Sequence, residues 1–255
     1  MSYISTNLNF LMTAVKKVAN SLSRDFSEIE QLQSSLRGHQ EFAKAAYERV
    51  SKGLRAELQK SRPNYAVVIG AEDVPVKAPY FLVSPLDGLL NFMHGIPYFA
   101  VSLAVVENDV VTAAVIYNPA TSDMYFAEKG KGTFKEGYRN HERLRVSSRK
   151  EVVDALIGAK DTALQYSAAG IRANGCLSLD LAYVASGKLD AVVSTENTPD
   201  MIAAGMLLVK EAGGSVYELN QKDIRSEDLA SVLASGNIIA ANAILGPKVH
   251  KLLNK

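Results

Sequence analysis

The stretch Tyr80-Phe-Leu-Val-Ser84-Pro85-Leu86-Asp87-Gly88-Leu89-Leu90-Asn91-Phe92 decides how this chain folds. The apolar, β-prone residues from Tyr80 to Val83 predict a strand that is buried on both faces. Pro85 has no backbone N–H to donate, so we expect the strand ladder to end there. Asp87 and Gly88 precede Leu89, which predicts a turn that opens into a short helix. A carboxylate at a strand end, beside free helix N–H groups, indicates a site for a cation together with a phosphate.

Length, charge and cysteine content narrow the class of protein. At 255 residues the chain can bury a large core, as one domain or as two tightly joined ones. A net charge of +1 makes nucleic acid and membrane surfaces improbable direct partners. The single cysteine, Cys176, excludes an internal disulfide and is typical of a cytoplasmic protein. We find neither a long uninterrupted apolar run nor a basic leader before an apolar core, so no membrane span or signal peptide is expected.

Residues 1–146 predict an α+β half with a large, mostly antiparallel sheet. Apolar residues at helical spacing predict helices over Leu8 to Phe26 and over Glu41 to Lys60. Apolar, β-prone runs predict further strands at Tyr65 to Ile69, Phe99 to Val106, Val110 to Tyr117 and Asp123 to Ala127. The turn Glu107-Asn108-Asp109 between two of these runs predicts a hairpin.

Residues 147–255 alternate between strand and helix patterns, which predicts an α/β half. We expect strands at Val152 to Ile157, Leu189 to Val193, Ser215 to Leu219 and Ile238 to Ala240. We expect helices at Leu179 to Ser186, at Met201 to Ala212 and towards Leu253, the last capped by Asn242. The pattern alone therefore predicts α+β followed by α/β.

Three sequence blocks resemble the inositol monophosphatase family. Ser84-Pro-Leu-Asp-Gly-x-x-Asn-Phe is similar to the family signature Asp-Pro-Ile/Leu-Asp-Gly-Thr-x-Asn-Phe. The second block runs from Arg172-Ala-Asn-Gly175 to Leu179-Asp-Leu-Ala-Tyr-Val-Ala-Ser-Gly187. The third contains Pro199-Asp-Met-Ile-Ala-Ala-Gly205 and Glu211-Ala-Gly-Gly214. The resemblance covers nearly the whole chain. It implies a layered α/β/α/β/α sandwich with two sheets and a Mg²⁺-dependent phosphatase ancestry.

The resemblance also shows which metal ligands of the family are replaced here. Of the family's five acidic positions, only Asp87 is retained. The other four are occupied by Tyr47, Ala71, Ser84 and Met201. Glu72 and Asp200 lie beside two of these positions and are further candidate metal ligands. Asp200 is offset by one residue at a helix start, which turns a side chain by about 100°.

The residues expected to face phosphate or substrate are better preserved than the metal ligands. They are Gly88, Leu89, Arg172 and Gly175, of which Leu89 replaces the family threonine that helps to orient the attacking water. The alternative for Gly175 and Arg172 is simply a turn and a surface charge. No catalytic residue is therefore assigned.

These substitutions support three hypotheses. The first is a divergent family member with lost or strongly reduced Mg²⁺-dependent phosphatase activity, a pseudoenzyme that binds a phosphorylated small molecule or a protein partner. The second is an active phosphatase acting on inositol phosphate or a related sugar phosphate through a rearranged site of Glu72, Asp87 and Asp200. The third is an interaction scaffold. Family resemblance also implies a homodimer, for which the segment Phe99 to Phe126 is the expected apolar surface.

Overall fold

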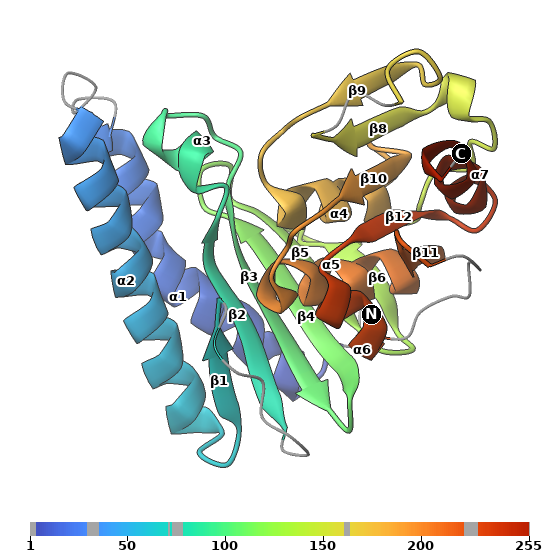
Figure 1. Cartoon of the computed structure of the whole chain (residues 1–255). Coiled ribbons are helices and arrows are strands. Elements are labelled where there is room, and N and C mark those ends of the chain that lie inside the picture. Colours follow the sequence, from blue (N-terminus) through green and yellow to red (C-terminus); the bar gives the residue numbers. More distant parts are fainter. Residues whose placement is uncertain are drawn as a thin grey trace.

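The computed structural model describes residues 4–29, 36–70, 72, 79–160, 164–221 and 229–254. Two sheets alternate with helices in five layers, ordered helix, sheet, helix, sheet, helix (Figure 1). This arrangement confirms the predicted α/β/α/β/α sandwich, with two mixed sheets. Three buried apolar clusters lie between the successive layers.

The first layer consists of two long antiparallel helices, α1 (Thr6–Ile29) and α2 (Leu36–Ser61), which cover one face of the first sheet (Figure 1). Their buried residues recur every three or four positions, as at Leu11, Val15 and Leu22, so each helix presents one apolar stripe to the sheet. Both predicted helices are confirmed, although α2 begins five residues earlier than expected.

The first sheet has seven described strands in the order in which they occur along the chain. Strands β1 and β2 are parallel, and all later neighbours are antiparallel. The strands are β1 (Ala66–Ile69), β2 (Tyr80–Asp87), β3 (Ala100–Glu107), β4 (Val110–Asn118), β5 (Asp123–Glu128), β6 (Gly132–Lys135) and β7 (Glu142–Arg143). The short helix α3 (Leu89–Met93) follows β2 directly, as predicted.

Helices α4 (Leu177–Ala185) and α5 (Pro199–Glu211) form the middle layer between the two sheets. The second sheet has the strand order β11-β12-β10-β8-β9, in which β10, β8 and β9 are parallel. Its strands are β8 (Leu156–Ala159), β9 (Gly170–Arg172), β10 (Ala191–Ser194), β11 (Gly214–Glu218) and β12 (Ile238–Asn242). Helix α7 (Leu245–Leu253) packs on its outer face, and α6 (Leu229–Ser235) lies beside β11. Asn242 Oδ1 accepts two N–H groups at the start of α7, as expected of a cap.

The structure corrects two strand boundaries. Strand β2 does not end at Pro85 but continues to Asp87, with a register shift between Ser84 and Asp87. This bulge accommodates the residue that cannot donate to the ladder. The strand predicted at Val152 to Ile157 is a 3₁₀ turn over Val152–Asp154 followed by β8, which ends only at Ala159.

The segment from Phe99 to Phe126 does not offer the apolar surface expected for a dimer. Almost all of its apolar side chains are buried in the clusters on the two faces of the first sheet. The homodimer itself stays a prediction, and so does the division of the chain at residue 146. No helix in the described ranges is long and apolar enough to cross a membrane.

We predict that Gly205→Ala destabilises the protein because α5 crosses α4 closely at this residue. A Cβ atom on Gly205 would lie 2.4 Å from both Cβ and Cδ1 of Leu181. The expected loss is about 1–3 kcal/mol in the free energy of unfolding, despite the better helix propensity of alanine. Urea unfolding measures it. A Leu181→Gly background removes both of these atoms, so Gly205→Ala should cost less there than in the wild type; an equal loss in both backgrounds would contradict the close crossing.

Candidate functional site

A pocket of about 350 Å³ opens where the carboxyl ends of β8, β9 and β10 face α3 and the start of α4. We call it the Asp87 pocket. In open α/β sheets, ligands bind in the crevice outside the carboxyl ends of parallel strands. Its walls combine apolar side chains with a small number of polar and charged groups. Those used below are Asp87, Leu89, Asn91, Lys160, Arg172, Asn174, Gly175, Cys176, Leu177, Asp180 and Met201.

Asp87 is buried at the end of β2, and its carboxylate faces the start of α4. Its Oδ2 atom accepts the backbone N–H of Ser178 at 2.7 Å. Ser178 is the second residue of α4, so Asp87 occupies the role of an N-cap side chain, which Cys176 does not supply. Burial raises the pKa of Asp87, and the hydrogen bonds from Ser178, Cys176 and Gly88 oppose that rise only in part. The one retained acid of the family signature is thus engaged by the protein itself.

Gly88 permits the sharp turn between β2 and α3. Its φ angle of 84° lies in the left-handed region, and a Cβ atom there would be 2.9 Å from the carbonyl oxygen of Tyr98. The turn places the next residue, Leu89, on the pocket wall, where the family carries a threonine. Leu89 presents a partly exposed apolar surface to the pocket and no hydroxyl.

A hydrogen-bond network fixes the loop that carries Gly175. Asn91 of α3 donates from Nδ2 to the carbonyl oxygens of Tyr98 and Asn174, both at 2.7 Å. The Asn174 side chain and the Tyr98 hydroxyl in turn donate to Oδ1 of Asp180, again at 2.7 Å each. Gly175 has a φ of 80°, and a Cβ atom there would lie 3.2 Å from the Asn91 side chain. The network therefore joins the two halves of the chain at the pocket.

Asp180 is a pocket residue to which the sequence analysis assigns no functional role. It lines the Asp87 pocket, and burial raises its pKa to about 6. The hydrogen bonds from Asn174 and Tyr98 oppose this rise, while the nearby Asp87 adds to it. Burial and Asp180 together raise the pKa of Tyr98. Tyr98 therefore remains a hydrogen-bond donor to Asp180 at neutral pH.

Ser84 and Asp200 are both buried, and neither lines the Asp87 pocket. Burial raises the pKa of Asp200, and the neighbouring side chains of Thr198 and Ser84 oppose the rise. Asp200 Oδ1 has no hydrogen-bond partner among the described residues. It is the next residue, Met201, whose side chain faces the Asp87 pocket. The offset of one residue expected from sequence thus separates this acid from the pocket.

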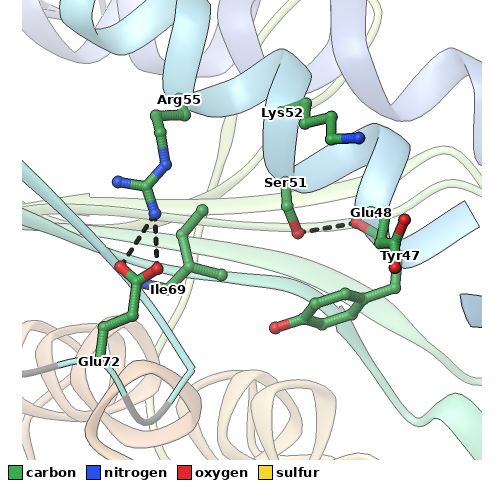
Figure 2. Close-up of a pocket in the computed structure, with 7 residues that line it drawn as sticks. All are labelled: Tyr47, Glu48, Ser51, Lys52, Arg55, Ile69 and Glu72. Carbon is green, nitrogen blue, oxygen red and sulfur yellow. Dashed lines mark hydrogen bonds and ion pairs between the residues drawn. The ribbon is translucent and has the colours of Figure 1, made fainter.

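Glu72 and Tyr47 lie in a second, smaller pocket of about 240 Å³ between α2 and the end of β1, which we call the Tyr47 pocket (Figure 2). Arg55 Nη2 donates to both carboxylate oxygens of Glu72, at 2.7 and 2.9 Å, and Glu72 also accepts the N–H of Ile69 at 3.0 Å. Arg55 lowers the pKa of Glu72. In Figure 2 the Tyr47 ring lies across the pocket from this pair. Ala71 lies outside the described residues.

The described residues do not fit a Mg²⁺ ion. Among them, no group of three or more His, Cys, Asp or Glu side chains is placed to hold a metal. Glu72 is paired with Arg55, Asp87 caps α4, and Asp200 is buried and does not line the Asp87 pocket. Apolar side chains of Leu89 and Met201 occupy pocket wall where Mg²⁺ requires oxygen ligands. The three candidate ligands are therefore not brought together around one cavity.

Lys160 is a pocket residue that the sequence analysis missed. It follows the last residue of β8 and lines the Asp87 pocket with Arg172 and Gly175. A lysine directly after a parallel strand was the available signal. It was overlooked because the strand was expected to end at Ile157.

Comparisons with a family model, with related sequences and with solved structures all support the resemblance to the inositol monophosphatase family. Residues 4–255 match the inositol monophosphatase family. An inositol-1-monophosphatase from Rhizobium meliloti is 36% identical over 98% of this chain and 97% of its own length. The Nus factor SuhB from Xylella fastidiosa is 30% identical over 93% of this chain and 92% of its own. The crystal structure of the extragenic suppressor protein suhB from Bartonella henselae superposes with a TM-score of 0.85 at 32% identity, covering 99% of this chain and all of that one.

We predict that Asp180→Asn stabilises the protein near pH 8 but not near pH 4.5. The carboxyl of Asp180 has a pKa raised from 3.8 to about 6, so its contribution to stability is fully present below about pH 4 and is lost as pH rises through about 6. Asparagine keeps an acceptor for Tyr98 and Asn174 without the buried charge. The expected gain near pH 8 is up to about 3 kcal/mol.

Urea unfolding of the wild type and Asp180→Asn at the two pH values measures this difference. Asp154→Asn, which replaces an exposed acid, serves as the control and should show no such dependence on pH. A gain of equal size at both pH values would contradict the raised pKa.

Proposed function

The chain belongs to the inositol monophosphatase family. We propose that it binds a phosphorylated small molecule in the Asp87 pocket, as family members do, but does not catalyse Mg²⁺-dependent hydrolysis. The family uses Mg²⁺ and binds phosphorylated sugars. The observation that supports the proposal is that no group of three or more His, Cys, Asp or Glu side chains among the described residues is placed to hold a metal ion. The one retained acidic ligand, Asp87, accepts the Ser178 N–H at 2.7 Å and caps a helix.

The pocket keeps the means to bind an anion. Arg172 supplies a permanent positive charge at the pocket wall. Asp180 and Asn174 are rigidly positioned polar groups suited to the hydroxyls of a polyol. A phosphorylated polyol therefore matches the chemistry of the walls.

The same walls lack what phosphate ester hydrolysis requires. The family mechanism uses metal charge to activate a water molecule and to stabilise the leaving oxygen. Four acidic positions are occupied here by Tyr47, Ala71, Ser84 and Met201, and Leu89 provides no hydroxyl to orient the water. Losses of about 2–3 kcal/mol at several positions lower the rate by many orders of magnitude, even though such effects are not additive.

We predict that the protein binds myo-inositol 1-phosphate in the presence of EDTA and releases no phosphate from it above background when Mg²⁺ is added. Calorimetry measures binding of the ligand and of Mg²⁺, and a phosphate assay measures turnover. The positive control is the variant Ala71→Glu/Ser84→Asp/Leu89→Thr/Met201→Asp. It should recover Mg²⁺ binding more fully than it recovers turnover.

Two outcomes would redirect the proposal. Tight Mg²⁺ binding by the wild type, with turnover that Asp87→Asn abolishes, would favour an active phosphatase with a rearranged site. Failure of the wild type to bind the sugar phosphate would favour a protein partner. That second candidate is supported by the similarity to proteins named Nus factor SuhB and by the exposed apolar side chains of Leu90 and Ile96 near the pocket.

We also propose that the protein is a homodimer, as its family resemblance implies. Light scattering at micromolar concentration should give twice the chain mass of 27.5 kDa. A single species of chain mass over the whole concentration range would rule the dimer out.

A further inference from the structure

Two exposed cationic residues, Lys160 and Arg172, line the Asp87 pocket from neighbouring strands. Arg172, the last residue of β9, pairs in register with Gly158 of β8, and Lys160 follows two residues beyond Gly158. Neighbouring strands lie about 4.8 Å apart and two strand residues span about 7 Å. Side chains as long as those of lysine and arginine can span this separation, and both residues line the same cavity.

Neither cation is neutralised by the part of the protein that the structure describes. Lys160 forms no ion pair with any described residue, and the Arg172 guanidinium donates from Nη1 to the carbonyl oxygen of Ile171 at 3.0 Å. By contrast, Lys248 pairs with Glu151, and Arg149 pairs with Asp190. Lys160 and Arg172 therefore keep their charges available to a ligand.

The acids that line the pocket are engaged elsewhere. Asp87 accepts the Ser178 N–H, and Asp180 accepts hydrogen bonds from Tyr98 and Asn174. The remaining titratable lining group is the Cys176 thiol, which is buried. A ligand that enters the pocket thus meets two exposed cations, whereas the hydrogen-bonded acids are buried.

We propose that Lys160 and Arg172 together form the seat for the anionic group of the ligand, and that this group is a phosphomonoester dianion. This inference rests on the proposed function. It adds that these two side chains supply the positive charge that Mg²⁺ supplies to the phosphate in the family. Arginine offers a planar fork that matches phosphate oxygens, and lysine adds a compact second charge. Two positive charges in one seat favour a dianion over a carboxylate or a phosphodiester.

The test titrates the full-length protein, in EDTA, with myo-inositol 1-phosphate, with inorganic phosphate and with uncharged myo-inositol. The variants are Lys160→Gln, Arg172→Gln and, as a matched control, Lys129→Gln, which replaces an exposed lysine between β5 and β6. Each pocket variant should weaken binding of the sugar phosphate by roughly tenfold or more, whereas Lys129→Gln should not change it. Raising the salt concentration should weaken wild-type binding more than binding by the pocket variants.

The outcomes separate this inference from the function on which it rests. If the wild type binds the sugar phosphate but Lys160→Gln binds it equally well, the two-cation seat is wrong and the proposed function stands. If the wild type binds none of the three probes, the proposed function fails and the seat with it. If myo-inositol binds as tightly as its phosphate, the anionic group is not what the pocket recognises, and the seat is overturned. Circular dichroism and thermal unfolding verify that each variant is folded.

Discussion

The carboxylate of Asp87 joins the two halves of the molecule by accepting the Ser178 N–H, across 91 residues of chain. One end of the contact is the last residue of β2, and the other is the first turn of α4, between the sheets. A side chain that accepts a free N–H group at a helix N-terminus stabilises the folded protein by about 1 kcal/mol. The helix dipole also favours a negative charge at this end. Because β2 ends at Asp87, the turn at Gly88 and helix α3 come next along the chain. This places Asn91 of α3 where it bonds to the carbonyl oxygens of Tyr98 and Asn174.

This constraint accounts for the electrostatics of the site. Asp87, Asp180 and Asp200 are all buried, and burial raises the pKa of each. In a metal site, the charge of the ion would offset the cost of burying carboxylates. Here protein N–H and O–H donors offset it in part, and Asp87 raises the pKa of both other acids. Asp87 and Asp180 therefore form a buried part of the pocket wall, and its positive charge lies on the exposed residues Lys160 and Arg172.

The sequence predicted most elements because their periodicity is strong and local. The stripe of α1 and the β3–β4 hairpin are examples, and the family motifs supplied the order of layers. The misses have local physical causes. A bulge carries β2 past Pro85, and the exposed turn at Val152–Asp154 contains enough valine to resemble a strand. The position of Lys160 in the Asp87 pocket depends on how distant segments of the chain pack together, and no local sequence pattern encodes this packing. The same holds for the placement of Glu72 and Asp87 in two different pockets.

The strand order of the first sheet has a consequence for how the chain acquires its structure. Because β1 to β7 lie side by side in the order in which they are synthesised, each strand finds its partner among residues that have already emerged. Such short-range pairings form quickly and suit folding from the N-terminus during translation. The Asp87 pocket is different, since its walls come from β2, β8, β9, β10 and α4. It closes only after the last of these has docked, so an intact pocket is a mark of completed folding.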